Sequence, residues 1–298
     1  MSNNGKYFGI NRPQKTITNK DPNEYFSVYN SLGELKSEYS FAIPKKNEID
    51  SRMITDNGVL LITLSGTLGL RIKSYENGEF ADEIDISKHM GDTRYNTLRQ
   101  FITEEGNIKI VGLVGPKKDM LGIDIYHINL DDLSVKRTES NEFDKEEIQK
   151  IYAAIAEKSV RWNESPSKGQ STFTEYIIEN LHEDKDGNSY VVVGRYNDYE
   201  DYKERTVYVG KDVLVIKINA EGKHEWSSAV YRNSESRKGS PDLSSYINNE
   251  KECLEMLSVD KSESNRNTEY RKINLENGNV MVYNTLPVRY ILDEDMVL

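Results

Sequence analysis

The chain has 298 residues and a formal net charge of −11. Surfaces that bind nucleic acid or anionic membranes need clustered Lys and Arg, so this charge argues against both classes of partner. The single cysteine, Cys253, excludes an intramolecular disulfide and a multi-cysteine zinc site. No run of about 18 apolar residues is present, so we expect no membrane insertion. These properties favour a soluble, acidic protein with a large core.

The N-terminal residues 1–9 are polar and lack the apolar segment of a signal peptide. We expect a cytoplasmic protein if this is the native N-terminus. If the N-terminus is truncated, an export signal has been lost, and the protein is expected to be secreted or periplasmic.

Hairpin patterns fill the chain from residue 25 onward. Apolar residues alternate with polar ones on both sides of turns that contain Gly, Asn or Asp, which tolerate the positive φ of tight turns. The best preserved hairpin runs from Asp212 to Trp226 around a turn at Asn219–Gly222. A further strand is expected near 254–259, and mobile loops at 233–248 and 258–268. The other expected hairpins are 25–41, 53–64, 70–86, 101–114, 123–135, 176–196 and 270–283.

The hairpins recur as pairs with a period near fifty residues once an insertion at about 139–172 is removed. Two hairpins per period indicate a four-stranded blade. The sequence therefore predicts one all-β, propeller-like domain over 1–298, with about five to six blades. The final apolar run at 288–298 either closes the ring against Tyr7–Ile10 or leaves it incomplete.

One helix is predicted inside the insertion. Asp144 is a candidate N-cap, Glu147 occupies the N3 position of a capping box, and Phe143 with Ile148 forms a hydrophobic staple. An apolar face at helical spacing follows, and the helix is expected to end near Lys158–Val160 and to dock on the sheets.

The stretch 212–226 has the pattern of a known β-propeller repeat. An apolar-polar-apolar strand end meets an Asn–Gly turn and then a Trp, at Ile216, Ile218, Asn219, Gly222 and Trp226. This unit resembles the repeat of bacterial quinoprotein-like propellers and of propeller-like secreted proteins of Bacteroidetes-type bacteria. The resemblance covers about one unit and implies a propeller fold.

The same comparison has consequences for a cofactor and for Trp226. The chain lacks the adjacent cysteines that methanol-dehydrogenase-type quinoproteins place near their quinone, so we expect no cofactor. Since the sister units carry no matching Trp, Trp226 is interpreted as a core residue between blades.

Metal and catalytic motifs are sparse. The histidines His89, His127, His182 and His224 form no spaced pair, so we expect no metal site. The run Asp184–Asn188 resembles the start of a calcium loop but lacks the distal Glu, and a hairpin turn is the favoured interpretation. Cys253 lies among carboxylates that raise a thiol pKa, so it is interpreted as structural.

The most suggestive surface is a long loop at 195–204. Tyr196, Asp198, Tyr199, Asp201 and Tyr202 alternate aromatic rings with acids there, a composition that suits recognition of proteins or sugars. The structural alternative is an extended, solvated hairpin tip whose rings lie on the neighbouring blade.

The sequence supports a binding or interaction module for a protein or glycan partner. The alternative is a carbohydrate-active hydrolase or lyase whose carboxylates converge on the central channel. A quinone-binding relative is a third hypothesis. No catalytic motif distinguishes these functions.

Overall fold

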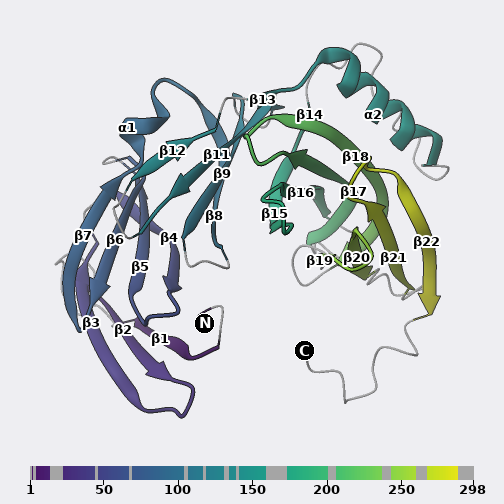
Figure 1. The fold of residues 1–298 in the computed structure, drawn as a ribbon. Coiled ribbons are helices and arrows are strands. Elements are labelled where there is room, and N and C mark those ends of the chain that lie inside the picture. The colour runs from purple at the N-terminus through teal and green to yellow at the C-terminus, as the bar shows by residue number, and fades with distance from the viewer. Residues whose placement is uncertain are drawn as a thin grey trace. The chain divides into compact units, whose positions relative to one another are not determined.

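The computed structural model describes residues 2, 5–13, 23–43, 46–66, 69–103, 107–116, 119–130, 134–138, 141–158, 173–200, 206–236, 243–259 and 267–287. They form an all-β, propeller-like fold of antiparallel sheets with two helices (Figure 1). This confirms the predicted fold class. The final run at 288–298, expected either to close the ring against Tyr7–Ile10 or to leave it incomplete, lies outside the described residues, and Tyr7–Ile10 belongs to β1, which pairs with β2.

Five main sheets and one two-stranded ribbon are described, and all pairings with a described register are antiparallel. The first sheet has the order β1 (Tyr7–Pro13), β2 (Asn23–Asn30), β3 (Leu35–Ala42), and the second runs β4 (Asn47–Ile54), β5 (Leu60–Gly66), β6 (Arg71–Glu76), β7 (Glu79–Asp85). The third has the order β12 (Val135–Arg137), β11 (Gly122–Ile128), β9 (Ile108–Val114), β8 (Tyr95–Ile102), with β13 (Asn141–Glu142) also on β11, while β10 (Asp119–Met120) and β14 (Phe173–Thr174) form the ribbon. The fourth runs β15 (Tyr176–Glu183), β16 (Ser189–Glu200), β17 (Thr206–Ile218), β18 (His224–Ser236), and the fifth β19 (Leu243–Asn248), β20 (Cys253–Val259), β21 (Asn267–Asn274), β22 (Val280–Pro287).

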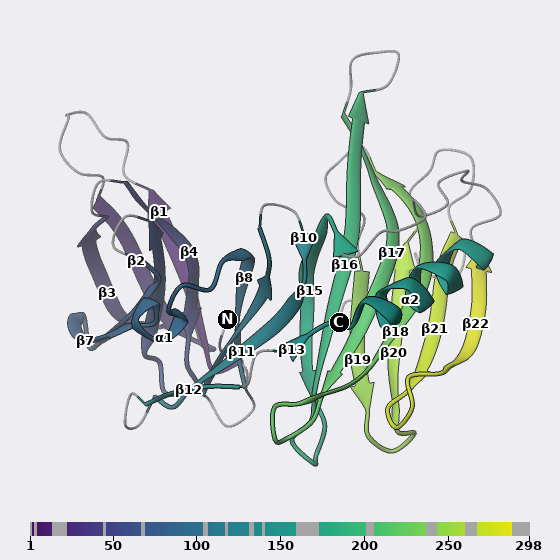
Figure 2. The same cartoon turned by 90° about the horizontal axis from the view of Figure 1, so that it is seen from above.

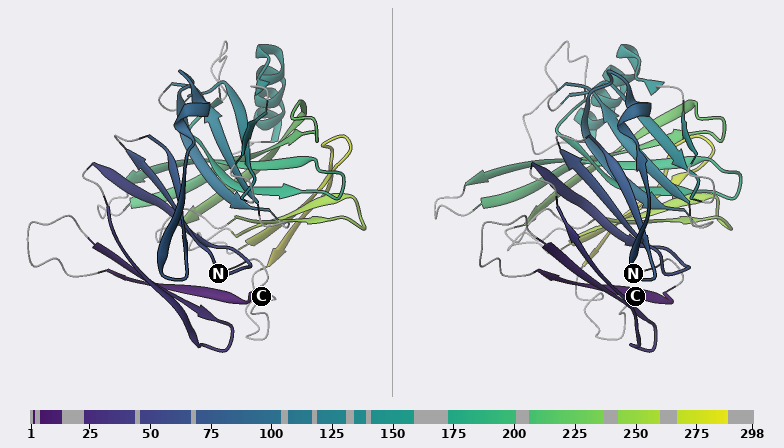
Figure 3. Two further views of the ribbon diagram at one scale, coloured as in Figure 1. Left: turned by 60° about the vertical axis from the view of Figure 1, so that its left-hand side comes forward. Right: turned by 90° about the vertical axis from the view of Figure 1, so that its left-hand side faces the viewer.

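The chain divides into two compact units. The first comprises Met1–Thr93, Gln100–Ile110 and Tyr126–Arg137, and the second Arg94–Arg99, Val111–Ile125 and Thr138–Leu298. In the first unit, the facing sides of sheets β1–β3 and β4–β7 pack against each other (Figure 3). Their buried core consists of Phe26, Val28, Tyr39, Ile54, Leu60, Ile62, Leu64 and Tyr75.

The second unit repeats this sheet-on-sheet packing between β15–β18 and β19–β22. Its central strands are continuous apolar runs, Val191–Val193 and Val213–Ile216, because both of their faces are buried. The shared core consists of Tyr190, Val192, Val213, Val215, Val230, Leu254, Met256, Ile273 and Leu275.

Trp226 packs between these two sheets, as the sequence predicts. Its ring lies 6.0 Å from that of Tyr190, and its Nε1 donates to the Glu276 carbonyl at 3.1 Å. A Cβ on Gly278, whose φ is +72°, would come within 2.7 Å of the Trp226 ring. The indole therefore fixes the fifth sheet's last turn against the fourth sheet.

One turn design recurs in the hairpins. In each of these turns, one side-chain oxygen accepts hydrogen bonds from the backbone N–H groups of the residues two and four positions later in the chain. The accepting residues are Asn30, Asp184 and Asn219. The residue three positions on is a glycine in each case, with φ between +79° and +88°. Such Asx turns close a hairpin locally, which explains why the turn residues were readable in the sequence.

The predicted helix is α2 (Lys145–Lys158). Asp144 caps it by accepting a bond from the Glu146 amide at 3.1 Å, and Phe143 and Ile148 are buried. α2 packs on β18, and Glu147 Oε1 lies 3.3 Å from His224 Nε2. A second helix, α1 (Ser87–Met90), is one turn long and was not predicted. No helix in the described part of the chain is both long and apolar enough to cross a membrane.

The predicted loop at 233–248 was wrong in part. Residues 233–236 belong to β18 and 243–248 form β19, so much of the expected 233–248 loop is strand. Backbone pairing to β17 and β20 overrides the polar composition of these stretches.

Candidate functional site

The first part of the predicted recognition loop at 195–204 is strand, because residues 195–200 belong to β16, while 201–204 lie outside the described residues. Beyond β15, the ladder between β16 and β17 continues from Tyr196↔Gly210 to Glu200↔Thr206. β18 follows it as far as Tyr208↔Ser236. Figure 2 shows β16 running past β15. We call residues 196–200 and 206–210 the hairpin extension. Residues 195–200 are therefore strand and not loop, which agrees with the extended hairpin that the sequence offered as the alternative, and alternating Val and Tyr residues at 207–209 favour strand.

The structure describes three of the five predicted site residues. Tyr196 lies at the base of the hairpin extension and is half-buried. Asp198 and Tyr199 lie in β16, with backbones paired to Tyr208 and Val207. Asp201 and Tyr202 lie outside the described residues.

A line of register shifts crosses the sheet where the extension begins. The pairing slips between Ile178 and Asn180 in β15, and between Gly194 and Tyr196 in β16. In β17 it slips again between Gly210 and Asp212. Bulges bend a sheet and redirect side chains, so this line sets the direction of the extension.

A buried ion pair occupies the line. Asp212 is fully buried, and its Oδ1 accepts from Arg195 Nε at 2.6 Å and lies 2.5 Å from the second guanidinium nitrogen. The Tyr176 phenol donates to Asp212 Oδ2, and burial followed by the Asp212 charge raises the Tyr176 pKa. Burial opposes the Arg195 cation, but attraction to Asp212 outweighs it and raises the pKa of Arg195. The Arg195 guanidinium is therefore charged at neutral pH, and the Tyr176 phenol keeps its proton.

A second carboxylate lies beside this pair. Glu179 is the residue skipped by the β15 register shift. A Cβ placed on Gly194 would lie 3.0 Å from Glu179 Oε1 and 2.9 Å from the Tyr196 ring, so both side chains cover the glycine. Glu179 Oε1 is buried and has no hydrogen-bond partner among the described residues. A buried acceptor left unpaired is costly, and it keeps the capacity to accept a donor from a ligand.

Sequence reasoning found Tyr196 but missed Glu179, Arg195 as an ion-pair partner, Asp212 and Tyr176. Glu179 is one acid among many in the sequence. Arg195 and Asp212 are separated by the whole hairpin, and only the register brings them together. The doublet Lys211–Asp212 inside an apolar strand was the available signal, since a charge there needs a buried partner.

The four histidines have separate environments. His182 Nε2 lies 2.8 Å from Ser245 Oγ, and burial lowers the His182 pKa to about 4. Burial, aided by Lys109 and Lys136, also lowers the His127 pKa to about 4. His224 contacts Ser227 and Glu147, and His89 lies in α1. Within the described ranges, no group of three or more His, Cys, Asp or Glu is placed to hold a metal ion.

The Asp184–Asn188 run forms the predicted hairpin turn. The Asp184 carboxylate accepts hydrogen bonds from the backbone amides of Asp186 and Asn188 and from the Tyr190 phenol. Burial raises the pKa of Asp184, but these hydrogen bonds outweigh it and lower the pKa overall. The oxygens that a calcium ion would need are therefore engaged within the turn.

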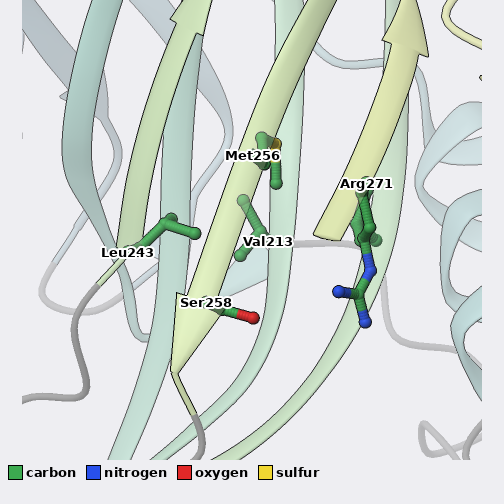
Figure 4. A pocket seen from close by; sticks show the side chains of 6 residues that line it. Val213, Leu243, Met256, Ser258 and Arg271 are labelled. Carbon is green, nitrogen blue, oxygen red and sulfur yellow. The ribbon is translucent and has the colours of Figure 1, made fainter. Parts of the chain in front are cut away.

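A pocket between β15–β18 and β19–β22 is lined by Val213, Val230, Leu243, Met256, Ser258 and Arg271 (Figure 4). The space between these side chains is too narrow to admit water. Its charged member, Arg271, is buried and lies 2.8 Å from Glu269. The pocket is therefore a packing defect of the core.

Comparison with known proteins identifies no family for this chain. No family model matches the chain, and no curated protein sequence matches it. A protein of unknown function from Bacteroides caccae superposes with a TM-score of 0.41 at 15% identity, covering 90% of this chain and 70% of that one. A polysaccharide lyase, Uly1, gives 0.34 at 10% identity over 91% and 88% of the chains. An endo-1,4-beta-xylanase from Bacteroides thetaiotaomicron gives 0.33 at 10% identity over 94% of each. Similarities of this size carry no functional argument.

Proposed function

We propose that the protein is a binding module that contacts a protein or glycan partner through the hairpin extension. The observation that supports this proposal is the backbone ladder between β16 and β17, which continues from Tyr196 to Glu200 beyond the line of bulges. The Arg195–Asp212 ion pair lies at the start of this ladder. A hairpin held in this way is ordered before binding, and preorganisation lowers the entropic cost of association.

The contact residues in this proposal are Tyr196, Asp198, Tyr199, Asp201 and Tyr202. Tyrosine offers a large, rigid contact area with a hydrogen-bonding hydroxyl, which suits both protein and sugar surfaces. Acids between the rings supply acceptors and favour a neutral or basic partner.

The alternative is a carbohydrate-active hydrolase or lyase. Glu179 supports it, because its buried Oε1 has no partner among the described residues. Paired-carboxylate hydrolysis requires a second carboxyl group that is free to act. The nearby Asp212 is engaged by Arg195 and Tyr176, so the binding function is the better supported of the two.

Two ligand libraries test the proposal: a printed glycan array and a phage-displayed peptide library. Each is probed with the wild type and with a Tyr196→Ala, Tyr199→Ala, Tyr202→Ala variant. A Phe80→Ala variant is the control, because Phe80 is an exposed ring on β7, which belongs to the first unit. Ligands retained by the wild type and the control but lost by the triple variant support the proposal. An unchanged ligand set in the triple variant, or no ligand in either library, overturns it, and cleavage of array glycans favours the enzyme.

A further inference from the structure

The fifth sheet carries a polar cluster on the face turned away from its apolar core. Five side chains meet there: Tyr246, Asn248, Glu255, Tyr270 and Lys272, which we call the tyrosine–glutamate cluster. In the ladder, Tyr246 pairs with Glu255, and Glu255 pairs with Lys272. One face of the sheet therefore presents these three side chains in a row.

Glu255 is the buried centre of the cluster. Its residue is 4% exposed, and its Oε2 accepts from the Tyr246 and Tyr270 phenols at 2.5 Å each. Its Oε1 accepts from Asn248 Nδ2 at 3.2 Å and lies 3.5 Å from Lys272 Nζ. Burial opposes the Glu255 charge, but these contacts outweigh it and lower the pKa to about 2. The carboxylate is an anchor that fixes two phenols in place.

The anchored rings remain accessible. Tyr246 is 50% exposed, and its neighbour on the same face, Leu257, is 37% exposed. The hydrogen bond to Glu255 raises the Tyr246 pKa to about 12, so the phenol keeps its proton at neutral pH. The Tyr246 phenol, which donates to Glu255, keeps lone pairs for a ligand donor, whereas the Tyr270 oxygen already accepts from Lys272. A phenol polarised by a carboxylate is a stronger acceptor.

The charge of the cluster selects its ligand. Lys272 Nζ lies 5.6 Å from the Tyr270 ring centroid, in the position that a cationic ligand would take over that ring. An anionic ligand would meet the Glu255 carboxylate. With one anion and one cation already paired, the face suits an uncharged molecule that has both hydroxyl donors and an apolar surface.

We propose that the tyrosine–glutamate cluster binds a neutral sugar, with a pyranose ring resting on Tyr246 and a sugar hydroxyl donating to the Tyr246 oxygen. This site is separate from the hairpin extension. It rests on the proposed function only in treating the chain as a binding module.

Calorimetric titration of the full chain with cellohexaose, xylohexaose and mannohexaose tests the proposal, with hexagalacturonate as an anionic comparison. At least one neutral hexamer is expected to bind, and Tyr246→Ala is expected to weaken it by about tenfold or more, the loss of one stacked ring. Tyr246→Phe keeps the ring and is expected to give a smaller loss. Phe80→Ala is the matched control, because Phe80 is also an exposed ring with a lysine, Lys73, 5.7 Å from its centroid.

Several outcomes would overturn the proposal. These are no binding of any neutral hexamer at millimolar concentration, equal binding of hexagalacturonate, or binding unchanged by Tyr246→Ala while the variant melts like the wild type.

Neutral-sugar binding lost in the Tyr196, Tyr199, Tyr202 triple variant but kept in Tyr246→Ala overturns this inference and supports the hairpin. The reverse pattern supports the inference and removes the hairpin as the sugar site. A dimer in sedimentation that Tyr246→Ala abolishes would assign the face to a second copy of the chain and also overturn the proposal.

Discussion

Single residues at turns and between sheets define the local geometry of this protein. Asx residues begin the hairpin turns, glycines with positive φ complete them, and Trp226 fills the space between two sheets. Most of these residues were readable in the sequence, because turn chemistry is local and depends on a few neighbouring positions. Partners such as Arg195 and Asp212 were not, because their contact depends on the register of a long hairpin.

Two glycines allow the stability cost of backbone strain to be measured separately from the cost of overpacking. Gly187 and Gly278 both have positive φ, and a Cβ would meet only Ala220 at 3.5 Å at the first but Trp226 at 2.7 Å at the second. Gly187→Ala is expected to cost about 1–2 kcal/mol from the left-handed backbone alone. Gly278→Ala adds overpacking of roughly 1–3 kcal/mol. Urea unfolding of both variants checks this, and equal losses would show that Trp226 is not packed tightly on the turn.

His182 predicts a dependence of stability on pH. Burial lowers its folded-state pKa from 6.5 to about 4, so below pH 6.5 the unfolded chain binds this proton before the folded chain does. Stability from His182 is therefore complete above pH 6.5 and is lost as the pH falls toward 4. His182→Gln is expected to flatten the fall in unfolding free energy across this window, with His127 retaining its own share. Denaturant titrations at a series of pH values measure the slope, and an unchanged slope in the variant would contradict the assignment.

At the scale of elements, the bulge line and its ion pair govern the hairpin extension. Asp212 and Arg195 lie where three strands change register, and the ladder continues above them. The sequence predicted the hairpins and the capped helix from alternation and capping signals. It left open whether 195–204 was a loop or an extended hairpin tip, because a polar, Tyr-rich segment is compatible with either, and the structure extends β16 to Glu200 and starts β17 at Thr206.

Breaking the ion pair is expected to destabilise the extension strongly. Asp212→Asn leaves the Arg195 charge buried without its counterion, at a cost of roughly 3–5 kcal/mol. Glu225→Gln removes the partner of Lys217 at 2.8 Å, where Glu225 is 39% exposed, and is expected to cost less than about 1 kcal/mol. Chemical denaturation compares the two variants.

The location of the damage is a second readout. Hydrogen exchange is expected to quicken at 196–200 and 206–210 in Asp212→Asn before the rest of the fourth sheet responds. Uniform quickening across the sheet would show that the pair stabilises the sheet as a whole and does not orient the extension.

At the scale of the whole molecule, the fold is built from repeated pairs of hairpins. A period of hairpin pairs predicted blade-like sheets, and the structure contains them with apolar cores between neighbouring sheets in each unit. The candidate site was predictable only in part, since repetition marks where a hairpin departs from its sisters but not which buried groups support it. The proposed binding function is therefore a claim about one hairpin that is longer than the repeat requires.

Hydrogen-exchange mass spectrometry of the full chain, with and without the tightest glycan or peptide selected in the library screens, tests this claim most directly. Binding through the hairpin extension predicts slowed exchange at 196–200 and 206–210 and a ligand of unchanged mass after incubation. Protection confined to other strands, or a cleaved ligand, would contradict it.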